Sequence, residues 1–150
     1  MTTTLDLNAI TGNLFDYWDL HFLSDVATVY PGVDGDTQNL SEWVDVELPE
    51  FGQRLGRASS PARGEFLWRV NIFVRRSNDL ARMNVIAEAV FSTISRMTIP
   101  LYALDSSETL LGYAQLLEAE IHNQTRPDRE SRAHDMQRAT IVIKGLVQET

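Results

Sequence analysis

Two stretches of the chain place their apolar residues three or four positions apart, which is the spacing of an amphipathic helix. The first covers residues 8–23, where Asp16 and Asp19 lie on the side opposite the apolar stripe. The second covers residues 78–96. The stripes consist of Ile10, Leu14, Trp18 and His21 or Phe22 in the first stretch, and of Leu80, Met83, Ala87, Val90, Phe91 and Ile94 in the second. We therefore predict two main helices.

Two further stretches alternate apolar and polar residues, which is the period of a half-buried strand. Residues 43–48 and 66–75 both follow this pattern, and we expect them to pair as a hairpin. The apolar faces carry Val44, Val46 and Leu48 in the first strand, and Phe66, Trp68, Val70, Ile72 and Val74 in the second. Before them, Val29-Tyr30-Pro31 predicts a strand end that leads into a polar loop, because the residue before proline favours extended backbone.

The last third of the chain predicts more strands. Residues 139–147 are rich in β-branched side chains. Residues 113–121 also alternate, and Asp105-Ser106-Ser107 ahead of them has the composition of a hairpin turn. Leu116 and Leu117 place apolar side chains on both faces, which leaves a helix possible there, and we favour a strand.

Two long polar segments separate these elements. Residues 49–64 hold three glycines and three arginines without an apolar period, and residues 123–138 are almost wholly polar. We expect both to be mobile loops, because connections of this length are functional or mobile rather than plain turns. The order of elements predicts an α+β fold: an antiparallel-rich mixed sheet of about four or five strands, with two main helices packed on it.

Composition adds bounds to this picture. A chain of 150 residues is expected to form a single domain over residues 1–150 with one sizeable core. The absence of cysteine excludes disulfides, thiolate metal sites and a cysteine nucleophile. No apolar run approaches the roughly 20 residues that span a bilayer, and the N-terminus lacks the pattern of a signal peptide. We therefore expect a soluble protein made in the cytoplasm, with no membrane partner.

The net charge of −8 is unevenly distributed along the chain. Residues 1–53 carry ten acids and no lysine or arginine, whereas residues 54–82 carry seven arginines and two acids. Residues 83–150 carry nine acids and six bases. Two interpretations stay open. Neighbouring strands could interleave these charges within one subunit, or one molecule could present an acidic and a basic face, which suits head-to-tail association into a ring.

Motifs for catalysis are missing from the sequence. A glycine-rich phosphate loop with Lys and Ser/Thr, a G-x-S-x-G turn and an H-E-x-x-H pair are all absent. His21, His122 and His134 are too far apart to show metal-ligand spacing. We therefore predict no enzyme, no cofactor and no metal site. A metal-dependent nuclease remains a distant alternative, because Lys144 and the carboxylates of residues 127–130 could supply its chemistry.

The arginines of residues 49–64 are the clearest candidates for an interaction. Arg54, Arg57 and Arg63 could form a solvated hairpin tip, contact an acidic face of another subunit, or contact DNA. The overall acidity argues against tight DNA binding, because that affinity comes mostly from excess cationic charge. We favour a protein contact.

A short pattern of residues resembles a known family. It runs T-V-Y-P-G, then D-x-x-x-L-S-E-W-V, then a strand, a long basic loop, the strand FLWRVNIFV and a helix that starts S-N-D-L. The matching residues are Thr28, Val29, Tyr30, Pro31, Asp36, Glu42, Trp43 and Val44. In this the chain resembles the tail terminator (tail completion) proteins of long-tailed bacteriophages, the minor tail protein U-like group. The resemblance covers residues 8–96 well and the rest loosely. Residues 123–138 are longer and more polar than the family pattern.

The resemblance implies a structural virion protein at the phage tail or neck. Such a subunit forms a homohexameric ring on the head-proximal end of the tail tube, ends tube polymerisation and offers a docking surface to the head. Its partners would be the tail-tube protein and a head connector or stopper protein. DNA would pass through an acidic lumen without specific binding, because like charges repel.

We expect the ring interface to use residues from the acidic and the arginine-rich segments. These residues are Arg54, Arg57, Arg63, Asp34, Asp36, Glu42, Asp45 and Glu47. A head-completion or connector protein is the nearer alternative, because such a neck component shares the size and the ring symmetry.

Overall fold

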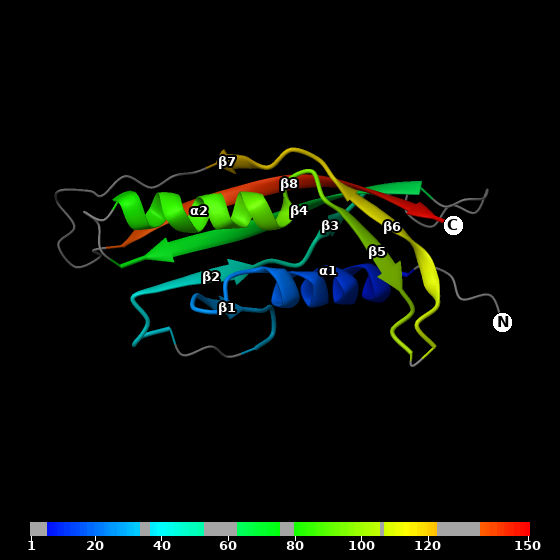
Figure 1. Cartoon of the computed structure of the whole chain (residues 1–150), viewed down its shortest axis with the longest axis horizontal. Coiled ribbons are helices and arrows are strands. Elements are labelled where there is room, and N and C mark those ends of the chain that lie inside the picture. Colours follow the sequence, from blue (N-terminus) through cyan, green and yellow to red (C-terminus); the bar gives the residue numbers. More distant parts are fainter. Residues whose placement is uncertain (1–5, 34–36, 53–62, 76–79, 106, 123–135) are drawn as a thin grey trace.

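The computed structural model describes residues 6–33, 37–52, 63–75, 80–105, 107–122 and 136–150. These residues form two helices and eight strands, in which each helix is followed by four strands (Figure 1). The helices are α1 (Leu7–His21) and α2 (Leu80–Ile94). The strands are β1 (Ala27–Val29), β2 (Glu42–Val46), β3 (Glu50–Phe51), β4 (Arg63–Val74), β5 (Thr98–Tyr102), β6 (Leu110–Leu116), β7 (Glu120–His122) and β8 (Gln137–Glu149).

All eight strands belong to one mixed sheet with the order β1-β2-β4-β8-β6-β5, while β3 pairs with β4 and β7 with β8. Among the described strands, only β1 and β2 pair in parallel. The centre is the long antiparallel pair β4 and β8, which runs from Arg63 opposite Gln148 to Val74 opposite Gln137. The last strand of the chain therefore lies in the middle of the sheet, between β4 and β6.

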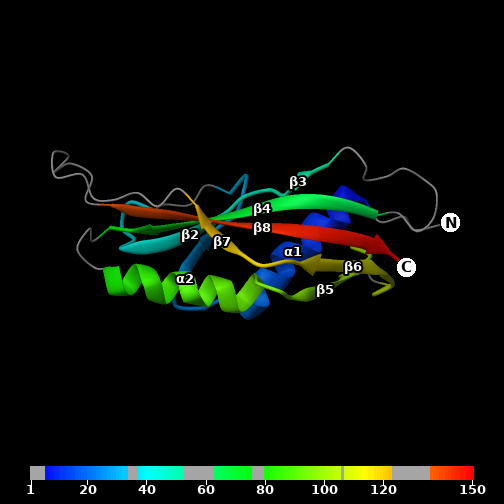
Figure 2. The same ribbon diagram turned by 90° about the horizontal axis from the view of Figure 1, so that it is seen from above.

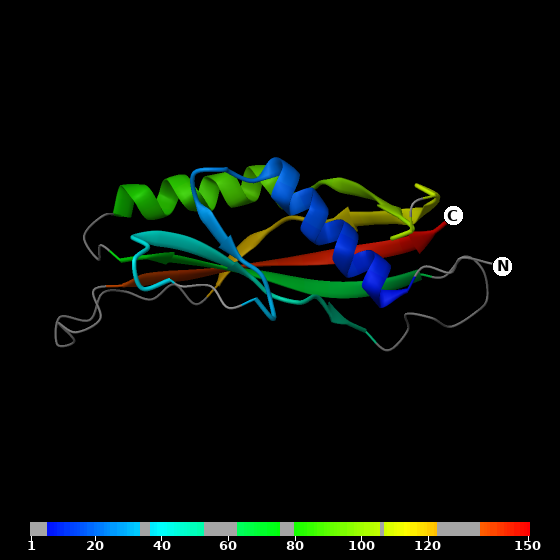
Figure 3. The same cartoon turned by 90° about the horizontal axis from the view of Figure 1, so that it is seen from below.

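Both helices pack on the same face of the sheet (Figures 2 and 3). The apolar stripe of each helix meets the inward residues of β4 and β8, which forms one core. Trp18 of α1 and Trp68 of β4 meet edge to face, with 6.1 Å between ring centroids. The side chain of Asp6 begins α1 by accepting a hydrogen bond of 2.7 Å from the Ala9 amide.

Several predictions from the sequence are confirmed. The two helices lie where the apolar stripes place them, and the alternating strands around Val44 and Trp68 pair antiparallel as β2 and β4. The turn at Asp105 joins the antiparallel strands β5 and β6, and the sheet is mixed.

The predicted count of about four or five strands is wrong, because the sheet contains eight. Three of them, β1, β3 and β7, have only two or three residues, which is too short for a visible alternation. The choice of strand over helix for residues 113–121 is confirmed, but the stretch is not one strand, since residues 117–119 separate β6 from β7.

The predicted boundaries of the two long loops also need correction. Part of the loop 49–64 is strand: it contains β3, and β4 already begins at Arg63. The loop 123–138 ends earlier than predicted, because β8 begins at Gln137. The residues of β3 and the first residues of β4 and β8 show no apolar period. They are strand because their backbones pair, β3 with β4 and β4 with β8. Residues 53–62 and 123–135 lie outside the described part of the chain.

Leu48 does not belong to the predicted apolar face. It follows the end of β2 and its side chain is 58% exposed. Within the described residues, neither helix is long and apolar enough to cross a membrane.

Candidate interaction surfaces

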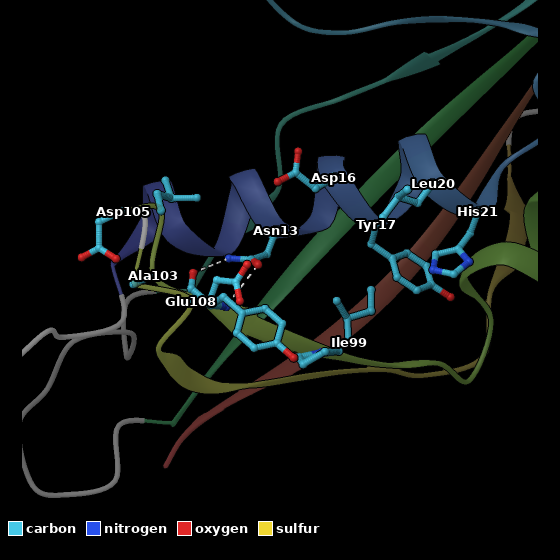
Figure 4. A pocket seen from close by; sticks show the side chains of 12 residues that line it. Asn13, Asp16, Tyr17, Leu20, His21, Ile99, Ala103, Asp105 and Glu108 are labelled. Atoms are coloured by element: carbon cyan, nitrogen blue, oxygen red, sulfur yellow. Dashed lines mark hydrogen bonds between the residues drawn. The ribbon is translucent and has the colours of Figure 1, made fainter.

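One candidate site lies where α1 crosses the edge strand β5. The side-chain amide of Asn13 on α1 donates to the Tyr102 carbonyl at 2.7 Å and accepts from the Tyr102 amide at 3.1 Å (Figure 4). Asn13 thus gives hydrogen-bond partners to the carbonyl and the amide of Tyr102 on the open edge of β5, as a neighbouring strand would. Pro100, which has no amide hydrogen, occupies the same edge.

A second contact brings the β5–β6 hairpin onto α1. A Cβ built on Gly12 would lie 2.9 Å from a methyl carbon of Leu104, so the glycine allows this leucine to approach the helix. Farther along α1, the Tyr17 hydroxyl donates to the Thr93 carbonyl at 2.8 Å, and the Tyr17 ring lies beside His21 at 4.3 Å (Figure 4). Burial raises the pKa of Tyr17, which keeps its hydroxyl a donor.

These contacts enclose a groove of about 670 Å³ between α1 and the β5–β6 hairpin. The described residues that line this α1–β5 groove include three carboxylates and no lysine or arginine. Two of its apolar members are largely exposed: Leu20 is 79% exposed and Leu104 is 58% exposed. The carboxylates belong to Asp16, Asp105 and Glu108. The groove therefore combines acidic groups with exposed apolar side chains.

The face of the sheet that bears no helix carries a buried polar network. Asn71 of β4 donates to the Glu47 carboxylate at 2.8 Å, and its side-chain oxygen accepts from the Thr140 hydroxyl at 2.7 Å. Arg138 donates to the same oxygen at 3.3 Å. Asn71 and Thr140 are both buried, and these hydrogen bonds satisfy polar groups that would otherwise be costly to bury.

Beside this network, arginines cover a pair of stacked rings. The rings of Trp43 and Phe73 stack with centroids 4.9 Å apart. The guanidinium of Arg75 lies 5.1 Å from the Trp43 ring, and that of Arg138 lies 5.5 Å from the Phe73 ring. Arg75 also donates to the carbonyls of Leu40 and Thr37, at 2.6 and 2.7 Å. The sequence pattern gave no signal for this arrangement, because its members lie on β2, β4 and β8.

Three of the predicted interface residues lie in β2 or directly after it: Glu42, Asp45 and Glu47. Glu42 receives two hydrogen bonds from Arg82 of α2, one of them 2.7 Å long, and Asp25 lies 3.9 Å from the same guanidinium. Glu47 accepts the bond from Asn71. Burial and the Glu47 charge raise the pKa of Asp45, and Arg138 opposes them. At Glu42 and Arg82, acidic and arginine-rich segments thus interleave within one subunit.

Of the other predicted interface residues, Arg63 alone belongs to the part of the chain that the structure describes. Asp34, Asp36, Arg54 and Arg57 lie outside the described residues. Arg63 begins β4, where its backbone pairs with Gln148. The role of all eight residues in an interface stays a prediction.

The residues of the nuclease alternative do not form a described metal site. Lys144 Nζ lies 3.3 Å from a Glu65 carboxylate oxygen on the surface. The carboxylates of residues 127–130 lie outside the described part of the chain. Among described residues, no three His, Asp or Glu side chains gather in a way that could hold a metal ion.

Tyr30 gives a prediction about pH. Its hydroxyl is buried beside the Asp19 carboxylate. Burial, with the nearby Asp19 and Asp16 carboxylates, raises its pKa to about 12. Because the folded pKa exceeds the unfolded value of about 10, this contribution to stability is complete below pH 10 and is lost as the pH rises toward 12.

We therefore expect Tyr30→Phe to make the protein less sensitive to alkali. Urea midpoints of both proteins at pH 8 and at pH 11.5 measure this, and the wild type should lose more stability over this interval. The other ionisable groups are common to both proteins and cancel in the comparison. An equal loss in both proteins would contradict the prediction.

No protein-family model and no curated protein matches this sequence. Solved structures share its fold. A chain from the virion of a native gene transfer agent particle superimposes with a TM-score of 0.61 and 12% identity, covering 94% of this chain and 96% of that one. A second solved structure gives a TM-score of 0.61 and 8% identity, covering 97% of this chain and 96% of that one. At these identities, the likeness concerns the fold, over nearly the full length of each chain.

Proposed function

We propose that this protein is a structural component of a phage-like virion, and that its subunits form a ring at the head-proximal end of the tail tube. One observation carries the proposal: nearly the whole chain shares its fold with a chain of the gene transfer agent virion. The resemblance of residues 28–44 to tail terminators points to the same class of particle. In this role the ring ends tube polymerisation and provides the surface for head joining.

The surfaces of the subunit support this proposal. A closed ring needs two different patches on each subunit, so that each copy contacts the next in the same way. The α1–β5 groove is one exposed patch with acidic and apolar character. The open sheet face is different in kind, because Arg75 and Arg138 cover its aromatic rings.

Electron microscopy of the purified protein, together with sizing by light scattering, tests the proposal. We expect closed rings of about the width of a phage tail, either from the protein alone or after addition of tail-tube protein. A particle that stays monomeric at high concentration in both conditions would count decisively against it.

A second measurement separates a tail terminator from a head-completion protein. We expect the protein to bind the ends of tail-tube polymers and to halt their growth, as followed by tube length in micrographs. Binding to DNA-filled heads in the absence of tubes would favour the head-completion role instead.

A further inference from the structure

The α1–β5 groove has the properties of an unfilled contact site. Leu20 on α1 and Leu104 on the hairpin both line the groove and are mostly exposed, and Tyr102, which also lines it, is 42% exposed. Exposed apolar side chains that gather around one hollow are typical of protein interaction sites. The volume of about 670 Å³ is large enough for a few side chains of a partner.

The charges of the groove define the chemistry of its occupant. Asp16 borders the groove on the α1 side, while Asp105 and Glu108 border it on the hairpin side (Figure 4). Hydrogen bonds from Ser107 lower the pKa of Asp105, so this carboxylate is charged at neutral pH. A segment that carries arginines on both sides of an apolar residue complements such a groove.

This chain contains a segment of that composition. Residues 53–62, with the sequence QRLGRASSPA, place Leu55 between Arg54 and Arg57 and include no acidic residue. We infer that the α1–β5 groove binds residues 53–62 of a second copy of the chain. Arg54 and Arg57 then meet the carboxylates of the groove, and Leu55 packs against Leu20.

This contact rests on the proposed ring and gives it a direction. The groove and the segment are different parts of the subunit, so each copy uses its segment on one neighbour and offers its groove to the other. Such a heterologous contact is the kind that repeats around a closed ring.

Complementary variants test the inference by sedimentation velocity. The groove variant is Asp16→Arg with Glu108→Arg, and the segment variant is Arg54→Glu with Arg57→Glu. Each variant alone should remain monomeric where the wild type forms rings. An equal mixture should form rings again, because an intact segment meets an intact groove at one contact, and the reversed acidic segment meets the reversed basic groove at the next.

The control variant, Glu88→Arg with Glu120→Arg, makes the same charge change on exposed residues away from the groove. It should assemble like the wild type. If a reversed variant fails to fold, as judged by circular dichroism, Leu20→Ser replaces the groove variant. We expect that substitution to raise the concentration needed for assembly by about tenfold, equivalent to about 1.4 kcal/mol. Its control, Val85→Ser on α2, should leave assembly unchanged.

The outcomes separate this contact from the ring itself. Rings that persist in both the groove and the segment variants overturn the contact and leave the ring standing. Folded variants that stay monomeric when mixed overturn the pairing of these two patches. A wild type that never assembles, alone or with tail-tube protein, overturns the ring and this contact with it.

Discussion

Trp68→Ala is expected to lower the free energy of unfolding by about 3–5 kcal/mol. The Trp68 side chain is fully buried in the middle of β4, and it packs against Trp18 of α1 and Phe15 at centroid distances of 6.1 and 6.4 Å. Its indole nitrogen donates to the Glu47 carbonyl at 2.9 Å. The substitution therefore leaves a cavity between the helix and the sheet and also removes a hydrogen bond.

Urea unfolding followed by circular dichroism measures this loss. Leu67→Ala is the matched control, because Leu67 is the preceding residue on the same strand but points to the other face and is partly exposed. We expect the control to cost much less. Equal losses for the two variants would show that Trp68 does not join the helix layer to the sheet as described.

Gly145→Ala is expected to destabilise the protein by about 1–3 kcal/mol, the usual cost of overpacking a core. Gly145 lies opposite Phe66 where β4 and β8 pair, and a Cβ at this position would overlap the Phe66 ring. Phe66 is buried against the core, so its ring cannot move away into solvent.

A double-mutant cycle identifies the cause of this destabilisation. Phe66→Leu removes the ring, so Gly145→Ala should cost clearly less in that background than in the wild type. Gly52→Ala serves as the control, because the added Cβ meets only the Glu65 carbonyl at an ordinary 3.5 Å. If the cost of Gly145→Ala is the same in both backgrounds, the overlap with Phe66 is not its origin.

The core faces of the regular elements could be predicted because they follow local periods. Ile10, Leu14 and Trp18 recur at helical spacing, and all three are fully buried in α1. The alternation along β4 predicted its buried face in the same way. The order of the strands could not be predicted, since β8 lies between β4 and β6 and pairs with strands that are far from it in the sequence.

The candidate groove had no signal in the sequence. Asn13 and Tyr102 are 89 positions apart, and nothing around either residue indicates that a helical amide satisfies a strand edge. Asn71 shows the same limit: it lies on the polar side of the alternation, yet its side chain is buried and hydrogen-bonded to Glu47, Thr140 and Arg138. Polar side chains become buried where distant strands bring partners to them.

Local pattern and composition were enough to establish the class of fold, the two helices, the buried face of each long strand and the change of charge at residue 54. These follow from spacing, because burying one face of a helix or strand requires apolar residues at a fixed period. Tertiary structure alone decided the eight-stranded order, the Arg82 pair that neutralises Glu42, and the acidic, leucine-rimmed groove between α1 and β5. Each of these depends on contacts between residues far apart in the chain, which no local period encodes.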